Sequence, residues 1–213
     1  RQMCIRDRYN SGPSRYRLSS DSDCTCSKQI AVILAQMEEM IDVLWHGRGG
    51  QGAFTAAKLL GAAYAVRGSY SIAFPSFGPE RRGAPVRVFT KLDSCRIGDR
   101  SEIEKADYVI YLDDTLFFNS FDELKENGKI IINTKKHFDD ERIIAVDADT
   151  LANEILKRTI TNTVMLGALA GVSGIVDSEN IAEAIRGYMP AKLQEKNIKA
   201  ALAAVDLVSG VAK

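Results

Sequence analysis

The residues with the clearest chemical potential lie in one short turn. An apolar run, "VLW", meets a glycine-rich stretch, "HGRGGQG", and a segment of small residues follows it. Glycines let a backbone approach a phosphate group closely, and the first N–H groups of a following helix can bind an anion. The candidate cofactor-binding or interface residues of this turn are Gly47, Arg48, Gly49, Gly50, Gln51 and Gly52.

The turn satisfies the pattern G-x-G-x-x-G, which is typical of dinucleotide-binding proteins. That pattern also requires an acidic residue about 20 positions later to bind the ribose. The corresponding stretch, Ile72–Pro75, contains none, so NAD binding is disfavoured. A nucleotide-triphosphate loop is disfavoured as well, because Ala53 and Phe54 follow Gly52 in place of Lys and Ser or Thr. Phosphate binding and a purely structural tight turn both stay open.

A second polar segment, "FPSFGPERRGAPVRVF", places charged side chains among prolines and glycines. Proline fixes its own φ angle, so we expect a rigid loop between two strand ends. One interpretation is a solvated surface loop. The other is a loop that shares a crevice with the glycine turn, because loops beside the switch point of an open α/β sheet meet there. Its candidate contact residues are Glu80, Arg81, Arg82 and Gly83.

Two further groups have a chemical and a structural interpretation. His46 precedes Gly47 and could be a general base, although a lone histidine at a strand end more often has a structural partner. Asp113 and Asp114 follow an apolar run and resemble a paired acid site, but Asp at such a place more often caps the next helix. No residue of the chain is assigned a catalytic role.

Apolar runs bounded by turn residues predict the strands that position these loops. A strand over residues 40–47 leads into the glycine turn, and the runs at 106–114 and 128–135 are typical of strands covered on both faces. Other strands are expected within residues 70–78, 84–92 and 142–148. Helices are expected over residues 53–68, 120–128, 149–158, 162–174, 178–189 and 191–210.

This alternation predicts an α/β fold. We expect a doubly wound, mostly parallel, Rossmann-like sheet with helices on both faces and a helical C-terminal region. Gly167 and Gly171 offer a smooth surface on one of these helices, which indicates close packing against another element.

Composition limits the classes of partner. Lys and Arg together number 28, as do Asp and Glu, so no global field favours nucleic acid or a membrane surface. Residues 1–36 are Arg- and Ser-rich, lack a periodic apolar pattern and resemble a non-native or disordered extension; residues 37–213 should form a single domain. No apolar run is long enough to span a bilayer and no signal peptide is recognisable, so a cytoplasmic location is expected.

Metal binding by the domain itself is not expected. Cys95 is its one cysteine, and His46 and His137 are its two histidines. These residues are too few to build a zinc site or an iron–sulfur cluster.

Several motifs taken together resemble one family. "WHGRGGQG", "FPSFGPERRGAPVRVF", "DYVIYLDDTL", "IINTKK" and "ITNTVMLGALAGVSGIV" occur in order over residues 41–208. In this order and spacing they are similar to the gamma subunits of the 2-oxoacid:ferredoxin oxidoreductases. The loop "GPERRGAPV" resembles the pyruvate and branched-chain members, whereas 2-oxoglutarate members tend to read "GPEMRGG".

The resemblance implies a subunit of an oxidoreductase that converts pyruvate and coenzyme A to acetyl-coenzyme A and CO2 and reduces ferredoxin. It implies that thiamine diphosphate, magnesium and 4Fe-4S clusters reside on alpha, beta and delta-type partner subunits, and that this chain is inactive alone. The glycine turn and the Glu80–Gly83 loop would then face those subunits or the path of coenzyme A. Two alternatives stay open: the gamma subunit of a 2-ketoisovalerate enzyme, and a stand-alone nucleotide-binding module.

Overall fold

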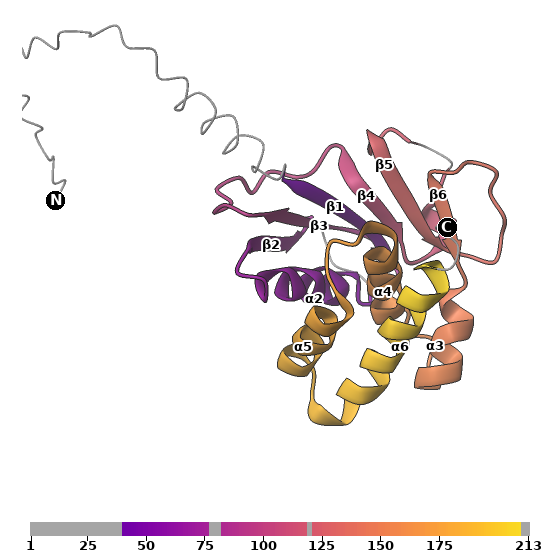
Figure 1. The fold of residues 1–213 in the computed structure, drawn as a ribbon. Coiled ribbons are helices and arrows are strands. Elements are labelled where there is room, and N and C mark those ends of the chain that lie inside the picture. Colours follow the sequence, from indigo (N-terminus) through magenta and orange to yellow (C-terminus); the bar gives the residue numbers. More distant parts are fainter. Residues whose placement is uncertain (1–39, 77–81, 119–120, 210–213) are drawn as a thin grey trace, which may run out of the picture. The chain divides into compact units, whose positions relative to one another are not determined.

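A computed structural model describes residues 40–76, 82–118 and 121–209 of the 213-residue chain. Within them lies one six-stranded sheet with the spatial order β2-β3-β1-β4-β5-β6 (Figure 1). β1, β4, β5 and β6 are parallel neighbours, whereas β3 runs antiparallel between β2 and β1. The α/β class and the mostly parallel sheet expected from the sequence are confirmed. The strands are β1 (Ile41–Arg48), β2 (Tyr70–Pro75), β3 (Pro85–Asp93), β4 (Ala106–Tyr111), β5 (Leu124–Asn133) and β6 (Ile143–Val146).

The central strand β1 divides its side chains between two apolar cores, because successive residues of a strand point to opposite faces. Val43 and Trp45 belong to the core on one face, and Leu44 belongs to the core on the other. The buried indole of Trp45 donates a hydrogen bond to the hydroxyl of Thr90 on β3 at 3.1 Å. The one polar group of this side chain is therefore satisfied inside the core.

The helices of the described residues pack on the face that contains Val43 and Trp45 (Figure 1). The expectation of helices on both faces is wrong for this part of the chain. The opposite face is covered by loop side chains, among them Ile103, Phe117 and Phe138. The helices are α2 (Ala53–Ala65), α3 (Ala148–Leu156), α4 (Asn162–Ser173), α5 (Ser178–Tyr188) and α6 (Ala191–Ser209).

A buried lysine fastens one of these covering loops to the sheet. Lys91 follows Phe89 by two residues on β3, so its side chain points to the loop-covered face. That side chain is 4% exposed and forms an ion pair with Asp99, in the loop after β3. The hydroxyl of Ser101 lies 3.4 Å from the same ammonium group. The charge of Lys91 is thus compensated by the loop that buries it.

The helix expected over residues 120–128 is wrong where the structure describes it. Leu124 begins strand β5 and is buried in the loop-covered core, where it pairs with Ala106 of β4. The polar residues around it are held by distant partners: Lys125 forms ion pairs with Asp42 and Asp107 at 3.1 and 2.7 Å. Contacts between strands therefore override a local pattern that favours a helix.

Helices α4 and α6 pack at the distance that the small residues of α4 allow. A Cβ added at Gly167 would lie 2.0 Å from the carbonyl oxygen of Ala201, and one at Gly171 would lie 2.9 Å from that of Val205. The close packing predicted for these two glycines is confirmed.

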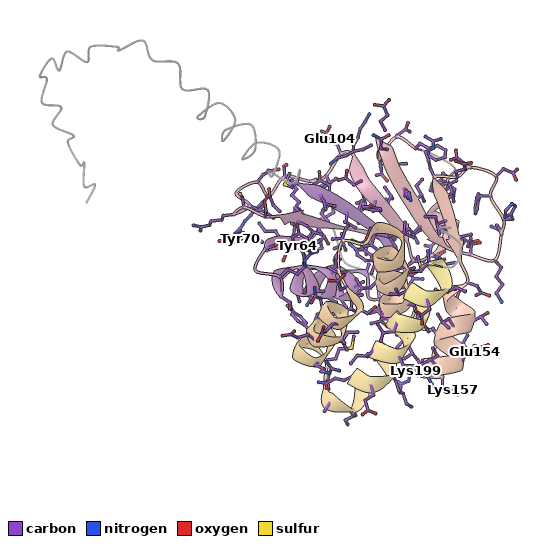
Figure 2. The ribbon with its side chains drawn as sticks, in the orientation of Figure 1. Tyr64, Tyr70, Glu104, Glu154, Lys157 and Lys199 are labelled. Atoms are coloured by element: carbon purple, nitrogen blue, oxygen red, sulfur yellow. The ribbon has the colours of Figure 1, made fainter. Side chains whose placement is uncertain are left out.

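Charged side chains of the helical layer extend into solvent, as Glu154 and Lys199 do, while Glu104 is exposed in the loop layer (Figure 2). None of the helices in the described residues has both the length and the apolar character needed to cross a membrane.

Candidate functional site

The carboxyl ends of β1 and β4 lie side by side where the strand order reverses. From β1 the chain passes through α2 to β2 and β3 on one side, and from β4 it continues to β5 and β6 on the other. Open α/β sheets bind ligands in the crevice outside such a point. The glycine turn leaves β1 here, and Asp113 follows β4 here.

The backbone of the glycine turn requires glycine at two positions. Gly50 and Gly52 have φ angles of +100° and +86°, a region that other residues rarely adopt. Gly52 is the N-cap of α2, and no side chain caps the helix by a hydrogen bond. A Cβ at Gly52 would also lie 2.6 Å from the amide nitrogen of Asn162. These features combine a tight structural turn with backbone N–H groups at a helix N-terminus, where anions can bind.

The glycine turn and the turn before β3 form one unit. The N–H of Gly49 donates to the carbonyl of Ala84 at 2.8 Å, and the N–H of Gly83 donates to the carbonyl of Gly49 at 3.0 Å. The guanidinium of Arg48 donates to the carbonyl of Gly83 at 3.2 Å. The glycine turn and the described end of the Glu80–Gly83 loop therefore lie together, as expected. Glu80 and Arg81 lie outside the described residues.

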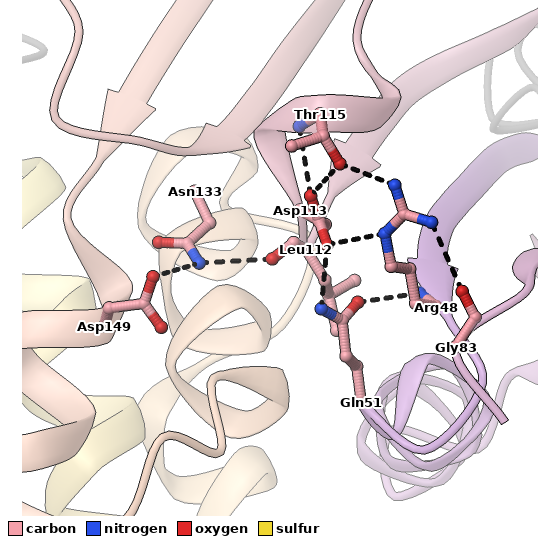
Figure 3. A network of polar contacts seen from close by, with 8 residues as sticks. All are labelled: Arg48, Gln51, Gly83, Leu112, Asp113, Thr115, Asn133 and Asp149. Atoms are coloured by element: carbon pink, nitrogen blue, oxygen red, sulfur yellow. Dashed lines mark hydrogen bonds and ion pairs between the residues drawn. The ribbon is translucent and has the colours of Figure 1, made fainter.

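Asp113 joins this unit to the end of β4 (Figure 3). Its carboxylate accepts hydrogen bonds from Nε of Arg48 at 3.0 Å and from Nε2 of Gln51 at 3.2 Å. It also accepts from the backbone N–H of Thr115 at 3.0 Å and from the Thr115 hydroxyl. The bond to the N–H caps the 3-10 turn η1 (Asp114–Leu116), so the capping role predicted for an Asp at this strand end is confirmed.

The side chains of this network bind one another at the switch point. Arg48 donates through all three guanidinium nitrogens, to Asp113, Gly83 and Thr115, and is 35% exposed. Burial disfavours the charged form of Asp113, but the hydrogen bonds from Thr115, Gln51 and Arg48 outweigh it and hold the pKa of the carboxyl below its usual value. The ion pair is therefore intact at neutral pH.

An open pocket of about 570 Å³ lies beside the glycine turn. Arg82 is exposed on its rim and has no hydrogen-bond or ion-pair partner among the described residues. Of the two arginines that line the pocket, Arg82 is thus available to a ligand and Arg48 is engaged within the chain. The pocket is lined by Arg48, Gly49, Gly50, Gly52, Ala53, Phe54, Thr55, Arg82 and Val86.

His46 has a structural partner. Its Nε2 lies 2.7 Å from the carboxylate of Glu123, and its ring stacks on that of Tyr111 with centroids 4.6 Å apart. Arg87 binds the other oxygen of Glu123 at 2.9 Å. These contacts lie on the loop-covered face of the sheet, away from the pocket beside the glycine turn.

Sequence reasoning did not identify the linking role of Asp113 and Thr115. The signal available was an acidic pair after an apolar run, which predicts a cap but does not indicate a partner in the glycine turn. Asp114 points elsewhere, since its carboxylate accepts a hydrogen bond from Thr134 and pairs with Lys136. Among the described residues, no group of three or more His, Cys, Asp or Glu side chains is arranged to hold a metal ion.

Comparison with known proteins gives a consistent set of similarities. A family model described as pyruvate ferredoxin/flavodoxin oxidoreductase matches residues 42–207. The chain is 45% identical over 166 residues to pyruvate synthase subunit PorC of Methanothermobacter thermautotrophicus, covering 76% of this chain and 92% of that protein. It is 44% identical over 174 residues to the common gamma subunit of the pyruvate/ketoisovalerate oxidoreductases of Pyrococcus furiosus, covering 76% and 94%.

A solved structure shows the same architecture. The crystal structure of pyruvate oxidoreductase subunit PORC from Thermotoga maritima superposes with a TM-score of 0.69 at 35% identity. The superposition covers 79% of this chain and 97% of that one.

Proposed function

The chain belongs to the pyruvate ferredoxin/flavodoxin oxidoreductase family, and from this premise we propose that it is the gamma subunit of an enzyme that oxidises pyruvate. In that enzyme pyruvate and coenzyme A give acetyl-coenzyme A and CO2, while two electrons pass to ferredoxin. The observation that carries the proposal is the similarity to PorC, which extends over 92% of that relative.

Within such an enzyme this chain has a supporting role. Thiamine diphosphate, magnesium and 4Fe-4S clusters are expected on alpha, beta and delta-type subunits. Cys95 is the one cysteine of residues 37–213, which is too few for a cluster. Ferredoxin is then reduced by the assembled complex, and the isolated chain is inactive.

The surface that meets the partners is the glycine-loop face, which we define as Gly47–Gly52 with Arg82 and Gly83. It combines a helix N-terminus, a guanidinium with no partner in the described part of the chain and an open pocket of about 570 Å³. Arginine is enriched at protein interfaces and also binds phosphate by its fork of donors. We favour contact with a partner subunit, with access of the coenzyme A phosphates as the alternative use of the same residues. Glu80 and Arg81 stay candidates for the same contact because they precede Arg82 in the sequence.

Reconstitution tests the assignment. The chain would be co-expressed with the alpha, beta and delta-type subunits and the complex isolated through a tag on a partner. We expect the chain to co-purify in fixed ratio and ferredoxin reduction to require pyruvate, coenzyme A and all subunits. Recovery of the chain as a free monomer beside an active complex of the other subunits would refute it.

Substitution of Arg82 tests the surface. Arg82→Glu reverses a charge that has no partner among the described residues, so we expect at least a tenfold weaker association with the partner subunits or a tenfold higher KM for coenzyme A, equivalent to about 1.4 kcal/mol. Arg100→Glu is the matched control, because Arg100 is exposed in the loop after β3, and β3 ends beside the start of β1, away from the glycine turn. Equal behaviour of the two variants would count against the proposed face.

A second substrate deserves a direct comparison, because the Pyrococcus furiosus relative is named as common to pyruvate and ketoisovalerate oxidoreductases. Rates of ferredoxin reduction with pyruvate and 2-ketoisovalerate, measured on the same complex, distinguish the two. A higher kcat/KM for 2-ketoisovalerate would replace pyruvate in the proposal.

The stand-alone nucleotide-binding module is tested on the isolated chain. Calorimetric titration with NAD, ATP and coenzyme A should show no micromolar binding, since Ile72–Pro75 at the end of β2 contains no acid to bind a ribose and the guanidinium of Arg48 is engaged by Asp113. Micromolar binding of NAD or ATP would favour the module.

A further inference from the structure

We propose that Asp113 is a positioning residue of the glycine-loop face: it holds Arg48 inward and joins three loops, so that Arg82 is the cation offered to the partner. The inference rests on the proposed function, because it specifies how the same face is kept in its binding conformation. Asp113 itself does not line the pocket.

The first support is the number of loops that meet at one carboxylate. Asp113 follows β4, and its oxygens accept hydrogen bonds from Arg48 and Gln51 of the glycine turn. Arg48 in turn donates to the carbonyl of Gly83, in the turn before β3. Gln51 completes the arrangement, since its side-chain oxygen accepts from the N–H of Arg48 at 2.7 Å. Removing the charge of Asp113 would loosen the link between all three segments.

The second support is the choice between two arginines. Arg48 and Arg82 both line the pocket, but the guanidinium of Arg48 already donates from each of its nitrogens within the chain. Without Asp113 the guanidinium of Arg48 would lose its counter-ion. The Arg48 side chain would then be free to turn outward beside Arg82. Two cations on this rim would change which anionic group the face recognises.

The third support is partial burial. The side chain of Asp113 is 18% exposed and that of Arg48 is 35% exposed, so the pair is screened less than a surface pair. Hydrogen bonds to an ionised group are stronger and better oriented than those between neutral groups. Asparagine at position 113 has the same size and keeps an acceptor, but it loses the charge that orients Arg48.

The experiment uses the assembled enzyme. Asp113→Asn is compared with Asp114→Asn, the adjacent carboxylate that binds Thr134 and Lys136 instead. The measurements are the melting temperature of the chain, its Kd for the partner subunits, and kcat and KM for coenzyme A and pyruvate. We expect Asp113→Asn to raise either the Kd or the KM for coenzyme A about tenfold, equivalent to about 1.4 kcal/mol, with kcat and the KM for pyruvate unchanged.

A double-mutant cycle tests whether Asp113 acts through Arg48. If it does, Arg48→Met combined with Asp113→Asn loses no more than the more severe single variant. Asp113→Glu, which keeps the charge, should restore part of the loss. If Asp113→Asn does not fold, Arg48→Met alone serves in its place, because it removes the other half of the same pair.

The outcomes separate this inference from the proposed function. Wild-type Kd and KM values for Asp113→Asn, or equal losses in Asp113→Asn and Asp114→Asn, would overturn the positioning role. Additive losses in the cycle would overturn it as well. If Arg82→Glu weakens binding while Asp113→Asn does not, the face is correct and only the role of Asp113 is wrong; if both variants are silent, the face itself is wrong.

Discussion

At the scale of single residues, Glu123 shows how a residue that resembles a catalytic group can have a structural role. A histidine before a glycine turn resembles a general base, yet His46 is bound by Glu123, which also binds Arg87 across the sheet. The histidine was visible in the sequence, but its partner was not, because Glu123 becomes a neighbour only when β5 has joined the sheet. The hydrogen bond from His46 is the main cause that lowers the pKa of Glu123, and burial opposes it.

The lowered pKa of Glu123 predicts a pH dependence of stability. A carboxyl with a lower pKa in the folded than in the unfolded state stabilises the fold above its unfolded pKa of about 4.3, and this contribution is lost as the pH falls through the folded value. Glu123→Gln should therefore flatten the decline of the unfolding free energy below about pH 5. Urea unfolding of wild type and variant between pH 7 and pH 3 measures this.

Glu126→Gln serves as the control, because Glu126 is exposed on β5, three residues after Glu123. Parallel stability curves for wild type and Glu123→Gln below pH 5 would contradict the prediction. A flattened curve for Glu126→Gln would contradict its assignment to Glu123.

At the scale of elements, the strands were predictable wherever a continuous apolar run is buried on both faces, as at 106–114 and 128–135. The segment at 120–128 was not, since the pairing of Leu124 with β4 and the ion pairs of Lys125 decide its conformation. The insertion of β3 between β2 and β1 is likewise a property of pairing rather than of local pattern. Glycines that lie between helices were recognisable, because small residues on one helical face have few other uses.

The close contact between α4 and α6 predicts that one methyl group added at Gly167 lowers the free energy of unfolding substantially. Gly167→Ala places a Cβ 2.0 Å from the carbonyl oxygen of Ala201, so the helices must separate. Overpacking of this kind costs about 1–3 kcal/mol or more, and we expect a corresponding loss in chemical denaturation.

Gly187→Ala is a matched control on α5, where an added Cβ meets nothing within 4 Å. Because alanine favours a helix over glycine, this change should stabilise the chain by up to about 1 kcal/mol. Equal effects of the two substitutions would show that propensity, and not the contact with α6, determines the result.

At the scale of the whole described domain, helices cover one face of the sheet and loops cover the other. The loops of the second face are held to the sheet by individual side-chain contacts, and the ion pair between Lys91 and Asp99 is one of them. The sequence predicted the two parts of the glycine-loop face separately, as the glycine turn and as the Glu80–Gly83 loop. The link through Asp113 could not be predicted, because it requires β4 to lie beside β1.

The ion pair on the loop-covered face predicts that removing the charge of Asp99 destabilises the chain. Asp99→Asn leaves the buried ammonium of Lys91 without its counter-ion, which is unfavourable. We expect the melting temperature to fall by several degrees and limited proteolysis to cut within residues 94–105 sooner than in wild type. Asp93→Asn is the comparison, since Asp93 forms no ion pair among the described residues; equal protease sensitivity of Asp99→Asn and wild type would refute the role of the pair.

The antiparallel course of β3 has a consequence for the order of folding. β3 begins beside the end of β1, so the glycine-loop face combines the turn after β1 with the turn before β3, and Asp113, which follows β4, holds it. These pairings are distant in sequence and form late compared with local helices. A chain still being synthesised and ended before residue 113 contains the residues of the glycine-loop face but lacks the carboxylate that holds Arg48. Partners that bind there would accordingly select chains whose central sheet is complete.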